Sequence, residues 1–244
     1  MGLSPYAANS NPDWFRRAWR VIIVIQSHID LLWGYLLYGD WRIYFLMGKS
    51  GRNESGRKLV IGLMGSASGT YSREVLRKAY ETGKAVAEND CVLITGACPG
   101  LPYETARGCI EAGGLSVGIS PGLSHWEHKT KYHSPDDLYD ILIFTGSGLM
   151  GREVTAIRSC DIVVIIGGRS GTLGEFSIAY DEGKLIGVVE ETGGITEHME
   201  RILTAIDKNT GAKILFDKDP ASLVKRLVDE YKREFYKHPS VFSD

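Results

Sequence analysis

The sequence has no excess of charge of either sign. Among its 244 residues, 28 lysines and arginines stand against 30 aspartates and glutamates, for a formal net charge of −2. A chain with this balance carries no overall field that would draw it onto nucleic acid or an anionic membrane surface. We therefore expect no nucleic-acid partner, and any anion site must be built locally.

Cysteine is also scarce and carries no pairing pattern. The four cysteines, Cys91, Cys98, Cys109 and Cys160, form no C-x-x-C pair, and three of them fall in or beside apolar segments. Such positions are typical of buried free thiols rather than of disulfides or a redox motif. We expect a reducing, cytoplasmic location.

No apolar run is long and unbroken enough to predict a transmembrane helix. Residues 1–47 still differ from the rest, because they hold four of the five tryptophans and the apolar runs 21–25 and 31–38. Arginines before the first run are typical of a signal peptide, but polar residues interrupt it and no small-residue cleavage site follows. Three interpretations stay open: an amphipathic helix that contacts a membrane surface, a helical arm that packs on the domain or on a second subunit, and an upstream stretch before a true start at Met47.

A single folded domain is predicted after a linker. Residues 48–57 are polar and rich in glycine, which favours a flexible linker, and the domain is expected to span 58–244. Strands are expected at 59–64, 92–95, 115–120, 141–145, 162–166, 185–189 and 214–216, and helices at 71–88, 103–112, 149–159, 172–182, 195–208 and 220–237. Continuous apolar strands that alternate with helices indicate a Rossmann-like, doubly wound α/β fold, with a parallel sheet of about seven strands and helices on both faces.

Four of the segments that follow these strands are rich in glycine. They span 65–70, 96–100, 146–148 and 167–172. Ligands of such sheets lie at the carboxyl ends of the strands, where glycine admits close backbone approach and helix N-termini attract anions. We expect a nucleotide or another phosphorylated small molecule at the following residues: Gly65, Ser66, Gly96, Gly148, Gly168, Arg169, Ser170, Gly171 and Thr172. The Walker and G-x-G-x-x-G patterns are both absent, which argues against a P-loop ATPase and a standard dinucleotide site.

The stretch 148–187 resembles the lysine-decarboxylase-like, or LONELY GUY, family of SLOG-type Rossmann domains. That family carries a P-G-G-x-G-T-x-x-E motif, and Gly168, Gly171, Thr172 and Glu175 match it. Gly167 stands in place of the proline and Arg169 in place of the second glycine. The resemblance covers residues 58 to about 217. Gly118-Ile119-Ser120-Pro121, followed by Glu127-His128, looks closest to a bacterial branch of hypothetical proteins that includes molybdenum-cofactor-carrier-like proteins.

In its catalytic members, the resemblance implies hydrolysis of the N-glycosidic bond of a nucleoside 5′-monophosphate, to free base and ribose 5-phosphate. Glu175 would stabilise the cationic ribose and activate water, and Arg152 on the preceding helix would hold the phosphate or ribose hydroxyls. The resemblance also implies a homodimer. No cofactor is expected, because nothing resembles a pyridoxal-phosphate site. The alternative function is a non-catalytic carrier or sensor of a nucleotide-like ligand such as molybdenum cofactor.

Each of these residues also has a purely structural interpretation. Thr172-x-x-Glu175 is a capping box, in which both side chains satisfy the first backbone donors of a helix. Arg152 alone is typical of a solvated helix residue or an ion-pair partner, and Arg169 can equally well face solvent. Three histidines at 125, 128 and 133 occupy no helical H-x-x-x-H frame, so we expect them to form a lid rather than a metal site.

Overall fold

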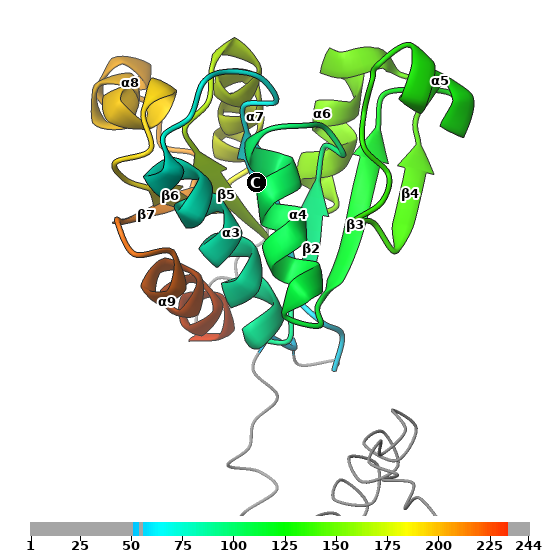
Figure 1. Cartoon of the computed structure of the whole chain (residues 1–244). Helices are drawn as coiled ribbons and strands as arrows, with labels where there is room; N and C mark the ends of the chain where they lie inside the picture. Colours follow the sequence, from blue (N-terminus) through cyan, green and yellow to red (C-terminus); the bar gives the residue numbers. More distant parts are fainter. Residues whose placement is uncertain (1–50, 54–55, 234–244) are drawn as a thin grey trace, which may run out of the picture. The chain divides into compact units, whose positions relative to one another are not determined.

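The protein is described by a computed structural model over residues 51–53 and 56–233. The predicted extension at residues 1–47 lies outside the described residues. The described part forms one parallel sheet with helices on both faces (Figure 1). The Rossmann-like α/β fold predicted from the sequence is therefore confirmed.

The sheet contains seven strands in the order β4-β3-β2-β1-β5-β6-β7, and every neighbouring pair is parallel. The strands are β1 (Val60–Gly65), β2 (Val92–Thr95), β3 (Leu115–Ser120), β4 (Ile141–Phe144), β5 (Ile162–Ile166), β6 (Leu185–Val189) and β7 (Lys213–Asp217). The central β5 is fully buried, as expected for a parallel strand covered on both faces. The strand order reverses at β1 and β5, where such sheets bind their ligands.

Helices cover the two faces in separate sets. The elements are α3 (Arg73–Glu88), α4 (Leu101–Glu111), α5 (His125–Thr130), α6 (Gly148–Arg158), α7 (Ser170–Asp181), the 3-10 helix η1 (Gly194–His198), α8 (Met199–Ile206) and α9 (Pro220–Arg233). One apolar cluster joins α3, α4 and α9 to one face of the sheet, and a second joins α6, α7 and α8 to the other. Side chains of successive strand residues enter the two clusters alternately, as the pleat requires.

The expected elements agree with the structure to within a few residues, with one omission. The short helix α5 was expected as part of a loop; Ser124 begins it by accepting a hydrogen bond from the Glu127 amide at 3.3 Å. Helix α4 begins at Leu101 rather than at 103, because Pro102 is tolerated in the first turn. Within the described residues, no helix combines the length and the apolar character that crossing a membrane requires.

The described end of the predicted linker is packed against the domain. Arg52 forms an isolated antiparallel bridge with Lys58, and both side chains pair with Asp90, at 3.1 and 2.6 Å. Gly51 is buried, with a φ of 77°, in a place where a Cβ atom would overlap the Asn89 carbonyl. These contacts fix the chain just before β1.

Candidate functional site

Three glycine-rich turns meet at the carboxyl edge of the sheet. The Leu101 amide, after β2, donates to the Ser66 carbonyl, after β1, at 3.2 Å. A Cβ atom on Gly167, after β5, would lie 3.1 Å from Leu101 Cδ1. The turns after β1, β2 and β5 are therefore in direct contact, as expected for a shared binding edge.

The turn after β5 requires glycine at position 168. Gly167 and Gly168 have φ values of 55° and 99°, and a Cβ atom on Gly168 would lie 2.5 Å from Thr172 Cβ. Helix α7 then begins at Ser170, with Arg169 as its N-cap residue and no side chain capping it. Among the described residues, the first amides of α7 therefore have no capping side chain, and free amides at a helix N-terminus favour an anion.

The same geometry rules out the capping-box interpretation of Thr172 and Glu175. A capping box requires threonine at the N-cap position, but Arg169 occupies it and both residues lie inside α7. Thr172 and Glu175 are 4% and 7% exposed, on the inner side of the helix. Glu175 is thus directed into the protein, not back to the helix start.

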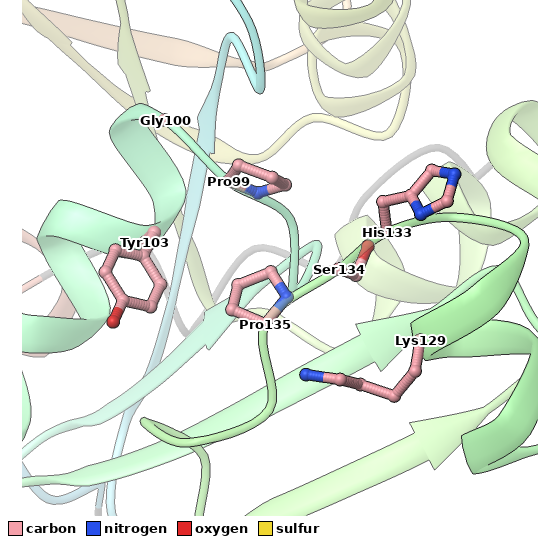
Figure 2. A pocket seen from close by; sticks show the side chains of 7 residues that line it. All are labelled: Pro99, Gly100, Tyr103, Lys129, His133, Ser134 and Pro135. Atoms are coloured by element: carbon pink, nitrogen blue, oxygen red, sulfur yellow. The ribbon is translucent and has the colours of Figure 1, made fainter.

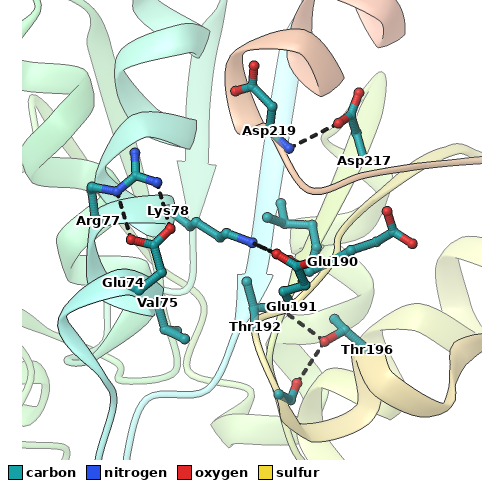
Figure 3. A network of polar contacts seen from close by, with 12 residues as sticks. Glu74, Val75, Arg77, Lys78, Glu190, Glu191, Thr192, Thr196, Asp217 and Asp219 are labelled. Atoms are coloured by element: carbon teal, nitrogen blue, oxygen red, sulfur yellow. Dashed lines mark hydrogen bonds and ion pairs between the residues drawn. The ribbon is translucent and has the colours of Figure 1, made fainter.

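A polar network behind the turn holds it in place. The Thr192 hydroxyl accepts a hydrogen bond from the Gly167 amide at 2.9 Å and donates to the Val189 carbonyl at 2.7 Å. In the same network, the buried Lys78 of α3 donates to the Glu190 carbonyl at 2.8 Å (Figure 3). Nothing in the sequence pattern indicates Thr192, because it lies 25 residues from Gly167 and in no motif.

Arg152 lies on the inner side of α6 and is 8% exposed. Its Nη1 donates to the Ile119 carbonyl at the end of β3, at 3.0 Å. Its Nε is buried and has no partner within the described residues. The guanidinium lies over Gly96, where any Cβ atom would overlap it. Glycine at position 96 therefore makes room for the arginine, which brings these two predicted site residues together.

Glu175 lies beside Arg152 but is not paired with it. Burial raises the pKa of Glu175 to about 8, the positive charge of Arg152 opposes the rise, and the nearby Glu153 adds to it. Within the described residues, the Glu175 carboxyl makes no hydrogen bond and no ion pair. At neutral pH it is mostly protonated and free to interact with a ligand.

Two further side chains adjoin this pair and were not predicted. Burial raises the pKa of the Cys98 thiol, and the charges of Arg152 and Glu175 act on it in opposite directions, which places Cys98 near both. Glu153 is 6% exposed, and burial raises its pKa. Its Oε2 lies 3.1 Å from the Cβ position of Gly174. Neighbouring residues of a helix point in different directions, so the sequence did not indicate that Glu153 is buried as well as Arg152. The packing of α6 on α7 shows it.

The remaining predicted residues lie around this centre in different ways. The buried Ser66 uses its hydroxyl to donate to the Ser68 carbonyl at 2.9 Å. Arg169 is exposed and reaches the turn after β1, where its Nη2 lies 3.1 Å from the Cβ position of Gly69. Gly148 begins α6, and its amide already donates to the Pro121 carbonyl at 3.1 Å. Gly148 therefore does not offer that amide to a ligand.

An open pocket of about 480 Å³ adjoins the turn after β2 (Figure 2). It is lined by Pro99, Gly100, Tyr103, Lys129, His133, Ser134 and Pro135. The turn therefore contributes Cys98 to the Arg152–Glu175 centre and the next two residues to this pocket. His128 is fully buried, between Ser120 Oγ and the Pro135 carbonyl, each at 2.9 Å. That histidine is structural, whereas His133 lines the pocket.

The fold and this edge define a Rossmann-like domain of the SLOG class, and the comparison with family models agrees. The chain belongs to the SLOG cluster4 family, whose model matches residues 58–224. The SLOG domain inferred from the resemblance is thereby confirmed, while the LONELY GUY branch stays a prediction.

Individual relatives are also similar to the chain, and the two solved structures among them share its fold. An uncharacterized protein of Archaeoglobus fulgidus is 36% identical over 126 residues, which cover 52% of this chain and 76% of the relative. A molybdenum cofactor carrier protein structure from Chlamydomonas reinhardtii is 29% identical, with a TM-score of 0.58 over 71% of this chain and 99% of that one. The molybdenum cofactor binding protein of Rippkaea orientalis is 25% identical, with a TM-score of 0.58 over 71% and 97%.

Proposed function

We propose that the protein binds a phosphorylated, nucleotide-like small molecule at the carboxyl edge of the sheet. The phosphate would lie at the N-terminus of α7, held by the backbone and hydroxyl groups of Ser170, Gly171 and Thr172. Arg169 would reach it from the rim, and Ser66 and Gly65 would border it from the turn after β1. Likeness to molybdenum cofactor carrier and binding proteins at 25–29% identity supports a ligand of this class.

We further propose that the bound ligand is a nucleoside 5′-monophosphate whose N-glycosidic bond is hydrolysed. The observation that carries this proposal is the buried pair of Arg152 and Glu175, whose free Nε and free carboxyl have no partner within the described residues. Burial of such groups is costly unless a ligand satisfies them. Their position beside the proposed phosphate site is suited to the ribose of a nucleotide.

In this reaction the bond between C1′ and the base nitrogen breaks, and its electron pair leaves with the base. Water adds to C1′, and the protons of water are shared between the new hydroxyl and the departing base. Glu175 in its ionised form stabilises the positive charge that develops on the ribose and takes a proton from water. Arg152 orients the phosphate or the ribose hydroxyls through its planar fork. Because the pKa of Glu175 is about 8, the fraction available as a base rises as pH approaches that value.

A second candidate function is carriage of a nucleotide-like ligand such as molybdenum cofactor, without chemistry. Two observations favour it: the departures from the catalytic motif at Gly167 and Arg169, and the likeness to carrier proteins. In a carrier, a neutral Glu175 would donate a hydrogen bond and would not repel an anionic ligand.

A turnover assay separates the two candidates. Purified full-length protein is incubated with a panel of nucleoside monophosphates, and free base is followed by chromatography, for wild type, Glu175→Gln and the control Glu200→Gln. Glu200 is an exposed residue of α8 and is not among the predicted site residues. Base release by wild type and the control, with loss of at least 100-fold in Glu175→Gln, supports hydrolysis. Binding without base release by any of the three refutes hydrolysis and supports carriage.

A further inference from the structure

One buried carboxyl beside the candidate site has no role in the reaction proposed above. Glu153 lies on α6 and is 6% exposed. Within the described residues, its carboxyl makes no hydrogen bond and no ion pair. Burial of a carboxyl without a partner is unfavourable, whether the group is neutral or ionised. Such a group indicates a partner that comes from outside the chain.

The Glu153 carboxyl faces the first turn of α7. Its Oε1 lies 3.7 Å from the Cβ position of Gly171, and no other heavy atom of the described residues outside α7 lies within 4 Å of that position. Its Oε2 lies 3.1 Å from the Cβ position of Gly174, one turn further along the helix. Gly171 is one of the residues proposed to hold the phosphate. The carboxyl of Glu153 therefore borders the proposed phosphate site.

The helix N-terminus and the carboxyl make opposite demands on a ligand. No side chain caps α7 among the described residues, so its first amides favour an anion. An ionised carboxyl at the same place would repel that anion, unless a proton lies between the two groups. A phosphate monoester can hold such a proton, because its second pKa is about 6, and a carboxyl can hold it as well. One shared proton would satisfy both groups.

The charged groups around Glu153 also favour a proton at this place. Burial raises the pKa of Glu153, and the positive charge of Arg152 on the same helix opposes the rise. On α7, the buried Glu175 is a second carboxyl, and its pKa is raised in part by the charge of Glu153. The thiol of Cys98, from the turn after β2, stays neutral because burial raises its pKa. One arginine thus faces two carboxyls, and a bound phosphate would add further negative charge.

We propose that Glu153 is a further ligand-binding residue and that it shares one proton with the phosphate of the bound ligand. The proton is taken up from solvent and lies in a hydrogen bond between a carboxyl oxygen and a phosphate oxygen. This inference rests on the phosphate site proposed above, and it adds a dependence on pH. At a pH too high for the proton to be held, the carboxylate repels the phosphate and binding weakens.

Calorimetry in paired buffers measures the shared proton. Full-length Glu175→Gln serves as the parent protein, because it lacks the other buried carboxyl and the proposed hydrolysis. It is compared with Glu153→Gln in the same background, and with the control Glu200→Gln in that background. Each protein is titrated with adenosine, guanosine, cytidine and uridine 5′-monophosphate from about pH 6 to about pH 9, in two buffers that differ in protonation enthalpy.

The parent and the control should bind a proton together with the nucleotide. Relative to the Glu153→Gln protein, we expect uptake of about one proton per bound nucleotide in the upper part of this pH range. Affinity should fall there by about 10-fold per pH unit, because each binding event needs a proton. The Glu153→Gln protein should show no such fall, since the glutamine amide donates its hydrogen bond at every pH.

Two results would overturn the proposal in different ways. If the parent binds a nucleotide but takes up no more protons than the Glu153→Gln protein, Glu153 has no part in binding and the phosphate site itself stands. If the parent binds none of the four nucleotides, the proposed nucleotide function is refuted, and this inference with it. Circular dichroism shows whether the Glu153→Gln protein is folded. If it is not, the parent decides alone, because zero proton uptake at every pH refutes the shared proton.

Discussion

Substitution of Glu175 by glutamine should change how stability depends on pH. Glutamine keeps the size of the side chain but cannot ionise. In the folded protein the pKa of Glu175 is raised from 4.5 to about 8, chiefly by burial. Between these two values the folded state binds more protons than the unfolded state, so this carboxyl makes wild type less stable as pH rises from about 4.5 to 8.

The magnitude follows from the shift. One pKa unit is worth about 1.4 kcal/mol. Between pH 5 and pH 9, this carboxyl should therefore lower the unfolding free energy of wild type by about 4 kcal/mol, a loss that Glu175→Gln does not show. Unfolding by urea at several pH values measures this difference, with Glu200→Gln as the matched control. The unfolding free energies of Glu175→Gln and Glu200→Gln should diverge steadily above pH 5. A difference between Glu175→Gln and wild type that stays constant from pH 5 to 9 would refute the assignment of a buried, neutral carboxyl.

Three other substitutions test the site. Arg152→Lys should weaken phosphorylated-ligand binding at least 10-fold in calorimetry, because lysine lacks the planar fork and the Nε donor; unchanged affinity would remove Arg152 from the site. Gly96→Ala should weaken binding similarly, because the new Cβ atom would displace the Arg152 guanidinium. Retained affinity would show that ligand binding does not depend on the position of the guanidinium over Gly96. Gly168→Ala should lower the unfolding free energy by about 2–4 kcal/mol, because its φ is 99° and its Cβ would meet Thr172, whereas Gly113→Ala, with a φ of 79° and open space, should cost about 1 kcal/mol. Equal losses in the two glycine variants would contradict the steric argument.

The sequence predicted the sheet well because its signals are local. Strands β5 and β6 are short, mainly apolar runs bounded by glycine or charge, and their shortness and flanking residues favour a strand buried on both faces. The short helix α5 was missed because six residues carry too little periodicity to distinguish a helix from a loop. Its start depends on Ser124, whose capping role is visible only once the helix is known.

The candidate site was predicted only in part. Glycines at turns indicate where backbone must approach closely, and the structure does place other atoms tightly against residues 65, 96 and 168, whose role in ligand binding stays a prediction. The alternatives for Thr172 and Glu175 could not be separated there, because the same spacing describes a capping box and a site residue. The start of α7 at Ser170 excludes the capping box, and the role of the two residues in a site stays a prediction. Glu153, Cys98 and Thr192 were not predicted, since their neighbours lie on other elements.

The sequence by itself therefore determined the strands, most helices and the carboxyl-end turns, because period, burial pattern and turn chemistry are properties of neighbouring residues. Only the tertiary structure decided which groups meet. It laid the Arg152 guanidinium over Gly96, buried Glu175 beside it without a partner, and raised the pKa of that carboxyl to about 8. Desolvation, long-range contact and exposure depend on elements distant in the chain, so no local pattern could fix them.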